Sequence, residues 1–282
     1  MEDYRKKFVV APGAKLKLKQ IDPGYKGHHE SDETVSHELA HHCSKIARLQ
    51  STLYAEKKRS VLIVLQALDA GGKDGTVNHV FSALNPQGAR VVGFKKPTDA
   101  ELAQDFLWRV HPHTPARGEL AIFNRSHYED VLVTRVHKLI DKPTWEERYK
   151  RIREFEATLA ENRTRIMKFF LHISKEEQLV RFGARLEDPA RNWKISESDY
   201  AEREYWDDYI SAFQDALSAT STKHAPWYVI PANHKWFRNL AVSQIVADTM
   251  EDMGMSYPKP TVDLAAIRRK DHAEERQEKG RR

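Results

Sequence analysis

The stretch that decides the fold reads Val61-Leu-Ile-Val-Leu-Gln-Ala-Leu-Asp-Ala-Gly-Gly-Lys-Asp-Gly-Thr76. It opens with an uninterrupted apolar run, Val61 to Leu65, which is rich in β-branched residues and too short for a buried helix. Such a run is typical of a central parallel strand that is covered on both faces. The following Gly71-Gly72-Lys73 predicts a tight turn, and we expect a helix to begin near Gly75 or Thr76.

A strand, a glycine-rich turn with a lysine, and a helix together form the arrangement of a phosphate-binding loop. Glycines let backbone N–H groups approach phosphate oxygens, the helix N-terminus favours negative charge, and the lysine adds a mobile cation. The candidate loop residues are Ala70, Gly71, Gly72, Lys73, Asp74, Gly75 and Thr76. A tight glycine turn with an incidental lysine is the alternative interpretation.

The match to the pattern G-x-x-x-x-G-K-[ST] is imperfect. Ala67 replaces the first glycine, Asp74 stands where a magnesium-binding Ser or Thr is expected, and Thr76 comes too late in the chain. Asp69 is the better metal candidate, because it is a carboxylate at the carboxyl end of a strand and Mg²⁺ prefers oxygen ligands.

Composition narrows the class of protein. The chain has 282 residues and a net charge of +5, which suits one large α/β domain with an appendage. A modest positive charge fits an anionic substrate, a nucleic-acid surface or simply a soluble basic protein. Cys43 is the only cysteine, so neither a disulfide framework nor a cysteine-based zinc site is available. No apolar run reaches membrane-spanning length and the start does not resemble a signal peptide, so we expect a cytoplasmic enzyme.

Further apolar runs complete a predicted α/β fold with a parallel sheet of five strands. After residues 61–65, the predicted strands are Arg90–Phe94, Gly118–Phe123, Ile166–Ile173 and Trp227–Pro231. The predicted helices are Ser31–Lys58, Thr76–Leu84, Asp99–Val110, Val131–Ile140, Thr144–Arg165 with its N-cap at Thr144, Ser198–Ala219 and Lys235–Met253. We expect residues 31–258 to form the domain, residues 1–30 an arm that wraps its surface or lies loose, and residues 259–282 a charged tail.

Polar residues follow two of these strands, and ligands of open parallel sheets bind at the carboxyl ends of the strands. Lys95 and Lys96 follow the second strand and could bind phosphate, although an exposed basic turn is an equal interpretation. Asn124 and Arg125 follow the third strand, where a second metal-binding acid is expected. Arg125 can clamp an oxyanion bidentately. Arg109 could reach a phosphate or form a surface ion pair.

A segment at about residues 175–219 departs from a plain α/β repeat. A loop between two predicted helices is punctuated by the basic residues Arg181, Arg185, Arg191 and Lys194. A helical hairpin with arginines beyond a nucleotide-binding sheet is typical of a lid that closes over phosphates and excludes water.

Three motifs together resemble polyphosphate kinase family 2. They are Asp69-Ala-Gly-Gly-Lys-Asp-Gly-Thr76, Phe123-Asn-Arg-Ser-His-Tyr-Glu-Asp-Val-Leu-Val133 and Asp188-Pro-Ala-Arg-Asn-Trp-Lys-Ile-Ser196. With their spacing, the similarity covers roughly residues 30 to 255. The resemblance implies a thymidylate-kinase-like P-loop kinase, a three-layer sandwich with a helical lid. The resemblance also explains why the phosphate loop departs from the pattern G-x-x-x-x-G-K-[ST], since the family typically has D-x-x-G-K-x-G-[ST] at this place.

The resemblance implies phosphoryl transfer between inorganic polyphosphate and a nucleotide with Mg²⁺, or Mn²⁺ in its place. Asp69 would hold the metal, Lys73 the transferring phosphoryl group, and Arg125 the phosphates beside it. The lid cations would bind polyphosphate. Many members have Asp where this chain has Asn124. This difference puts metal coordination at position 124 in question, and Glu129 is the acid that would replace the missing carboxylate. The form with Asn124 resembles the subgroup that accepts both AMP and ADP.

The resemblance also implies adenine nucleotides as acceptors, with guanine nucleotides as the other candidates, and a homo-oligomer, either a dimer or a tetramer. We expect neither a nucleic-acid nor a membrane partner. Two alternatives stay open: an ATP-dependent nucleoside monophosphate kinase, and a non-catalytic polyanion-binding protein that keeps a degenerate loop. The absence of an aromatic-and-basic stripe argues against nucleic-acid binding.

Overall fold

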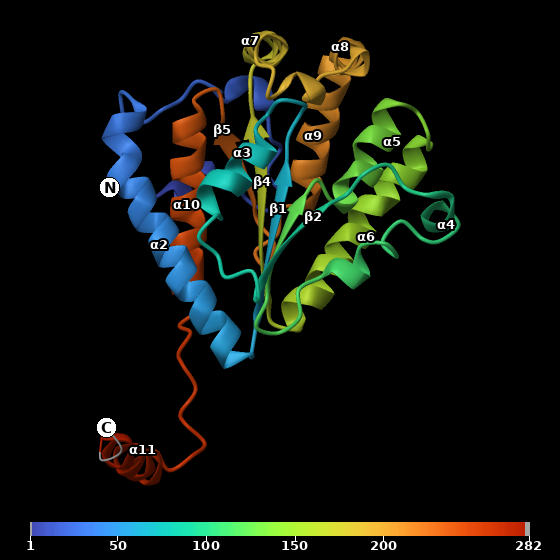
Figure 1. Ribbon diagram of the computed structural model, residues 1–282. Coiled ribbons are helices and arrows are strands. Elements are labelled where there is room, and N and C mark those ends of the chain that lie inside the picture. The colour runs from blue at the N-terminus through green and yellow to red at the C-terminus, as the bar shows by residue number, and fades with distance from the viewer. Residues whose placement is uncertain (1, 280–282) are drawn as a thin grey trace.

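The computed structural model describes residues 2–279 and contains one parallel sheet in the order β2-β3-β1-β4-β5 (Figure 1). The strands are β1 (Ser60–Gln66), β2 (Ala89–Gly93), β3 (Leu120–Asn124), β4 (Thr164–His172) and β5 (Trp227–Pro231). Every residue of β1 is buried, because β3 and β4 flank it in the sheet and helices cover both of its faces. All five predicted strands are therefore confirmed, with small shifts at their ends.

Helices form the two outer layers, which confirms the predicted three-layer sandwich. On one face lie α2 (Asp32–Glu56), α3 (Lys73–Val80) and α10 (Lys235–Glu251), and on the other lie α5 (Val133–Val136), α6 (Lys142–Glu161) and α9 (Trp206–Thr220) (Figure 1). The lid helices α7 (Lys175–Glu187) and α8 (Glu197–Glu202) lie beyond the carboxyl ends of the strands (Figure 1). This placement puts the basic loop between them at the edge of the sheet where ligands bind.

Two predicted helix starts are wrong, and local hydrogen bonding explains both. Helix α3 begins at Lys73 rather than near Gly75, because Gly72 adopts a left-handed conformation (φ 101°) and turns the chain directly into the helix. Helix α6 begins at Lys142, and its N-cap is Asp141 instead of Thr144. The Asp141 carboxylate accepts a hydrogen bond from the Thr144 amide at 3.0 Å, so Thr144 lies inside the first turn.

Three predicted helices are shorter or broken. The helix expected at Asp99–Val110 ends at Leu102 as α4, and the Asp105 carboxylate then bonds the Leu107 amide in a local turn. The helix expected at residues 131–140 is a 3-10 helix, His127–Val131, followed by α5. The predicted second lid helix, Ser198–Ala219, divides into α8, a 3-10 turn at Arg203–Tyr205, and α9.

The N-terminal arm packs along the domain, and a few buried residues anchor it in the core. It contains α1 (Tyr4–Phe8) and a 3-10 helix, Leu18–Gln20. Tyr4, Phe8 and Leu18 are buried. The arm also touches the free edge of the sheet, where the Val10 amide donates to the Trp227 carbonyl at 2.8 Å. Apolar burial and this edge contact together hold the arm in place.

The charged tail contains α11 (Leu264–Lys279), a helix without a buried residue that stands away from the domain (Figure 1). Its composition predicts this outcome, because a segment with few apolar side chains gains little by packing. Within residues 2–279, no helix is both long and apolar enough to cross a membrane.

A fully buried ion pair joins the sheet to α6. Lys168 on β4 donates to the Glu156 carboxylate at 2.6 Å, to the Tyr128 hydroxyl at 2.9 Å and to the Thr220 carbonyl at 2.8 Å. The Tyr128 hydroxyl also reaches Glu156 at 2.9 Å. Burial lowers the pKa of Lys168 to about 8, against the opposing attraction of Glu156. Because every charge here has a partner, the network ties the segment that follows β3 to the core.

We expect Lys168→Met to destabilise the protein by about 3 to 5 kcal/mol, because the Glu156 carboxylate is then buried without a counter-charge. Urea unfolding measures the loss. The double variant Lys168→Met/Glu156→Gln should recover most of it. The control Lys150→Met removes an exposed pair with Glu154 and should change stability by less than about 1 kcal/mol. A double variant as unstable as the single one would contradict this account.

Candidate active site

The phosphate loop connects β1 to α3 and has an unusual backbone. Ala70 (φ 60°) and Gly72 (φ 101°) both adopt left-handed conformations, and the Gly71 amide donates to the Leu68 carbonyl at 3.0 Å. A positive φ is costly for alanine, so the surrounding structure must hold this conformation. A Cβ atom on Gly71 would lie 2.5 Å from that of Ala67. The glycines are therefore required by space as well as by dihedral angle.

Lys73 is the first residue of α3, and its side chain is buried beneath the loop. Its Nζ donates to the Ala67 carbonyl at 2.8 Å and lies 3.4 Å from the Leu68 carbonyl. Burial, and next the charge of Arg125, lower the pKa of Lys73. The predicted loop lysine thus bonds carbonyls of its own loop, and it also lines the cleft above that loop.

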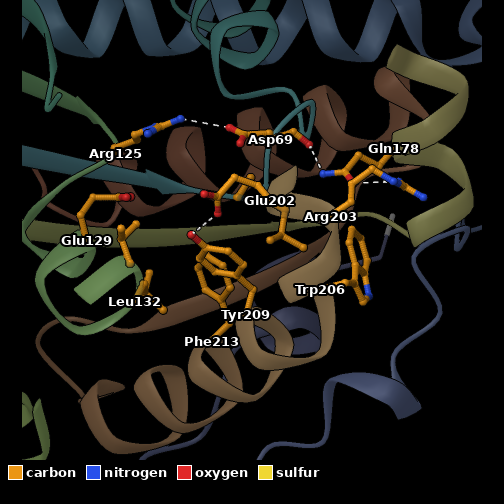
Figure 2. Close-up of a pocket in the computed structure, with 13 residues that line it drawn as sticks. Asp69, Arg125, Glu129, Leu132, Gln178, Glu202, Arg203, Trp206, Tyr209 and Phe213 are labelled. Carbon is orange, nitrogen blue, oxygen red and sulfur yellow. Dashed lines mark hydrogen bonds and ion pairs between the residues drawn. The ribbon is translucent and has the colours of Figure 1, made fainter. Parts of the chain in front are cut away.

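Asp69 and Arg125 form an ion pair at 3.0 Å, which brings the ends of β1 and β3 together (Figure 2). Arg125 has a left-handed backbone (φ 63°), and its amide donates to the Leu65 carbonyl at 3.1 Å. Burial alone would lower the pKa of Arg125, but the Glu129 and Asp69 carboxylates raise it. The guanidinium is therefore a firmly held cation beside the candidate metal ligand.

Asp74 links the phosphate loop to the lid. Asn124 donates from Nδ2 to one Asp74 oxygen at 2.8 Å, and Lys194 donates to the other at 3.1 Å. Burial alone would raise the pKa of Asp74, but these two hydrogen bonds lower it. The lid loop thus already reaches the loop that follows β1.

Most of the predicted phosphate-binding residues line one large cleft, here called the cationic cleft. It runs between the phosphate loop, the end of β2 and the lid. The predicted residues that line it are Asp69, Ala70, Gly71, Gly72, Lys73, Asp74, Gly75, Lys95, Lys96, Asn124, Arg125, Arg181, Arg185, Arg191 and Lys194. Residues far apart in the sequence therefore form a single basic surface, as an elongated anion requires.

Besides Glu129, two predicted residues lie outside the cleft lining, and Arg181 lines the cleft from a buried position. Thr76 is fully buried, and its hydroxyl donates to the Gly72 carbonyl at 3.1 Å. Arg109 lies outside the cleft lining and donates to the Lys95 carbonyl at 2.9 Å, so it supports the basic turn from below. Arg181 is buried at the base of the cleft and pairs with Glu177 at 2.7 Å.

A second cavity, here called the aromatic pocket, adjoins the cleft at Asp69 and Arg125 (Figure 2). Its remaining lining residues are Ala67, Leu68, Glu129, Leu132, Val133, Gln178, Glu202, Arg203, Trp206, Tyr209 and Phe213. Figure 2 shows that the aromatic residues come from α9, on the side turned toward Asp69. Of its lining residues, the sequence predicted only Asp69, Arg125 and Glu129. The spacing of Trp206, Tyr209 and Phe213 marks one face of a helix, but core packing accounts for that pattern equally well.

Polar contacts connect the aromatic pocket to the phosphate loop. Gln178 donates to the Asp69 carbonyl at 2.9 Å, and Arg203 donates to the Gln178 side chain at 2.8 Å. The Tyr209 hydroxyl donates to Glu202 at 2.8 Å. Burial raises the pKa of Glu129, against the charges of Arg125 and Lys73. The pocket combines aromatic surface with a few polar groups, which is typical of a small-molecule site.

The acids at the junction have the chemistry of magnesium ligands. Among residues 2–279, no cluster of three His, Cys, Asp or Glu side chains offers a complete metal site. Mg²⁺ commonly takes only one or two protein carboxylates, with phosphates and water as its other ligands. Asp69 lines both cavities and matches that mode. Glu129 lines the pocket beside it, and Asn124 keeps its side-chain oxygen available.

The strand order, the loop after β1 and the basic lid define a P-loop kinase-like phosphotransferase. The chain belongs to the polyphosphate kinase 2 family, because residues 29–258 match the family described as "Polyphosphate kinase 2 (PPK2)". The resemblance seen in the sequence and the predicted enzyme class are thereby confirmed.

Similar proteins cover nearly the whole chain. The AMP/ADP-polyphosphate phosphotransferase of Meiothermus ruber is 50% identical over 256 residues, covering 90% of this chain and 96% of that protein. The ADP-polyphosphate phosphotransferase of Rhodopseudomonas palustris is 45% identical over 277 residues, covering 93% and 94%. The crystal structure of polyphosphate kinase 2 from Arthrobacter aurescens matches with a TM-score of 0.91 at 42% identity, covering 95% of each chain.

We expect Gly72→Ala to abolish anion binding at the loop. Alanine tolerates a φ of 101° poorly, and its Cβ would lie only 1.8 Å from Nη1 of Arg238. The measurement is the rise in melting temperature that inorganic tripolyphosphate produces, which should disappear in the variant. Gly183→Ala is the matched control, because a Cβ there meets no atom within 4 Å. An unchanged ligand-induced shift in Gly72→Ala would contradict the geometry described above.

Proposed function

We propose that this enzyme transfers a phosphoryl group from inorganic polyphosphate to AMP and to ADP, reversibly and with Mg²⁺, or Mn²⁺ in its place. The observation that carries the proposal is the meeting of two cavities of different chemistry at Asp69 and Arg125. One is a long cationic cleft and the other an aromatic pocket, so a polyanionic donor and a nucleotide acceptor each have a suitable site. The name of the Meiothermus ruber relative supports acceptance of both nucleotides.

The donor is assigned to the cationic cleft. Polyphosphate carries about one negative charge per repeat, so it requires a continuous cationic surface and its affinity should depend on salt. Lys95, Lys96, Arg185, Arg191 and Lys194 face this cleft from β2 and the lid. Lys194 already contacts Asp74 of the phosphate loop. This contact supports a role of the lid loop in covering a chain of phosphates that lies across the phosphate loop.

The acceptor is assigned to the aromatic pocket. Trp206, Tyr209 and Phe213 offer ring surfaces for a nucleobase, and Arg203 and Gln178 offer donors for its polar groups. The pocket opens toward Arg125, which can hold the acceptor phosphate bidentately. In this proposal the acceptor phosphate binds at Arg125 and the donor phosphate at Lys73, because in-line transfer needs the two phosphates to be opposed.

Phosphoryl transfer requires alignment and charge neutralisation more than covalent help from the protein. Lys73 and Arg125 would neutralise the moving group from the two sides. Asp69 would hold Mg²⁺, which when bound neutralises charge on the phosphate oxygens and orients them. Glu129 and Asn124 are the further candidates for contact with the metal shell. The predicted cytoplasmic location and the homo-oligomeric state stay predictions.

The test is product formation from AMP and, separately, from ADP, with long-chain polyphosphate and Mg²⁺ as the only additions. ATP should form from both nucleotides, and Asp69→Asn should lower kcat at least 100-fold because the metal loses its carboxylate. ATP from ADP alone would reject AMP acceptance. If ATP phosphorylates AMP while polyphosphate does not, the protein is an ATP-dependent nucleotide kinase. No product with any donor would favour a binding protein.

We expect Trp206→Ala to raise KM for AMP and ADP about tenfold while KM for polyphosphate changes less than twofold. Loss of stacking on a base typically costs about 1 to 3 kcal/mol. Steady-state kinetics with each substrate varied in turn provides the measurement. The control is Trp145→Ala, which removes a ring that packs on Tyr149 outside both cavities. Equal changes in both KM values would reject the assignment of the pocket to the acceptor.

A further inference from the structure

Arg238 is a buried arginine beside the phosphate loop. It belongs to the first turn of α10, its exposure is only 2%, and it lines the cationic cleft. The loop lies directly against its guanidinium. A Cβ on Gly72 would lie 1.8 Å from Nη1, and a Cβ on Gly75 would lie 3.1 Å from Nη2. The glycines at these two positions therefore leave the space that the guanidinium occupies.

The charge of Arg238 has no counter-charge within the described chain. Among residues 2–279, no carboxylate forms an ion pair with it, and Nε and Nη2 both donate to the neutral Asn239 side chain, at 3.1 and 2.8 Å. No acceptor in the same residues takes a hydrogen bond from Nη1. The neighbouring charges of Arg181 and Lys235 are also positive. Burial, and next the charge of Arg181, lower the pKa of Arg238 to about 9.

Two other buried arginines show how this fold normally satisfies a guanidinium. Arg181 pairs with Glu177 at 2.7 Å and donates to the carbonyls of Ala70, Ala232 and Asn233. Arg109 donates to the Lys95 carbonyl and lies 3.7 Å from Asp130. Both therefore have structural partners. Arg238 has only an amide, and burying an unpaired charge is unfavourable unless a ligand supplies the missing partner.

We propose that Arg238 binds a phosphate group of the polyphosphate donor, so that the donor supplies the counter-charge that the protein lacks. This inference rests on the proposed function for the identity of the donor. The guanidinium lies beside Gly72 and Gly75 of the loop, and Arg238 and Lys73 line the same cleft. A planar guanidinium can hold two phosphate oxygens at once, which suits it to fix the position of the donor chain.

The experiment is isothermal titration of inorganic tripolyphosphate into the full-length protein, without nucleotide, at several salt concentrations. Arg238→Met should weaken binding at least tenfold and reduce the slope of log K against log salt by about one, because one cation no longer meets a phosphate. Arg238→Lys keeps the positive charge but loses the planar guanidinium that can hold two oxygens at once. This variant should therefore keep the native salt slope and bind tripolyphosphate with intermediate affinity.

Controls separate a binding role from a structural one. Arg153→Met is the matched control, because Arg153 donates to the Ala219 carbonyl outside both cavities. This variant should bind tripolyphosphate with the affinity of the native protein. The affinity of Arg238→Met for AMP should stay within twofold of the native value. A disturbed fold would instead weaken the binding of both AMP and tripolyphosphate. Weaker binding of both ligands by Arg238→Met, with a salt slope equal to that of the native protein, would overturn the inference.

The remaining outcomes distinguish this inference from the proposed function. If the native protein binds tripolyphosphate and Arg238→Met binds it within twofold as tightly, the role of Arg238 is rejected and the donor assignment stands. If the native protein does not bind tripolyphosphate, the donor assignment itself is rejected and the inference falls with it.

Discussion

The contact between Asp69 and Arg125 depends on the parallel pairing of β1 with β3, and much of the site depends on that contact in turn. Leu65 and Asn124 are paired in the register, so the residues that follow them leave the sheet at the same height. Arg125 and Ala70 then adopt left-handed backbones that neither side chain favours. The strain is sustained because β1 is buried between two neighbours and the Lys168–Glu156 network anchors the segment after β3. A shift in the register would separate the metal ligand from the phosphate clamp.

Charge is distributed unevenly around this junction. Cations from the phosphate loop, the turn after β2, the lid and α10 face one cleft. The two carboxylates of the phosphate loop already have partners: Asn124 and Lys194 bind Asp74, and Arg125 binds Asp69. Such an excess of positive charge is unfavourable in the free protein, particularly where the side chain is buried. It becomes favourable when a polyanion enters, since the ligand then supplies the charges that the fold omits. The arrangement of cations thus favours an extended phosphate chain over a neutral or compact ligand.

The sequence predicted the sheet and the phosphate loop well, because both rest on local signals. A short β-branched run predicts a buried strand, and glycines beside a lysine predict an anion-binding turn. Helix boundaries were predicted less well. At Asp141 and Asp105, side chains bond the backbone and move a helix end, and such short-range competition is weakly encoded in periodicity. The sequence left open whether the N-terminal arm is loose or packed, because its apolar residues, among them Tyr4, Phe8 and Leu18, are too scattered to form a periodic pattern.

By itself, the sequence determined the strand-loop-helix unit, the family through its three motifs, and most of the residues that line the cationic cleft. Those features depend on neighbours in the chain or on fixed motifs. Only the tertiary structure decided that α9 presents Trp206, Tyr209 and Phe213 to the junction, that Arg181 is a structural partner of the loop, and that Arg238 lies against it without a carboxylate. The reason is that a side chain's role depends on which distant groups surround it. Burial and charge balance are properties of the assembled core, and residue spacing does not encode them.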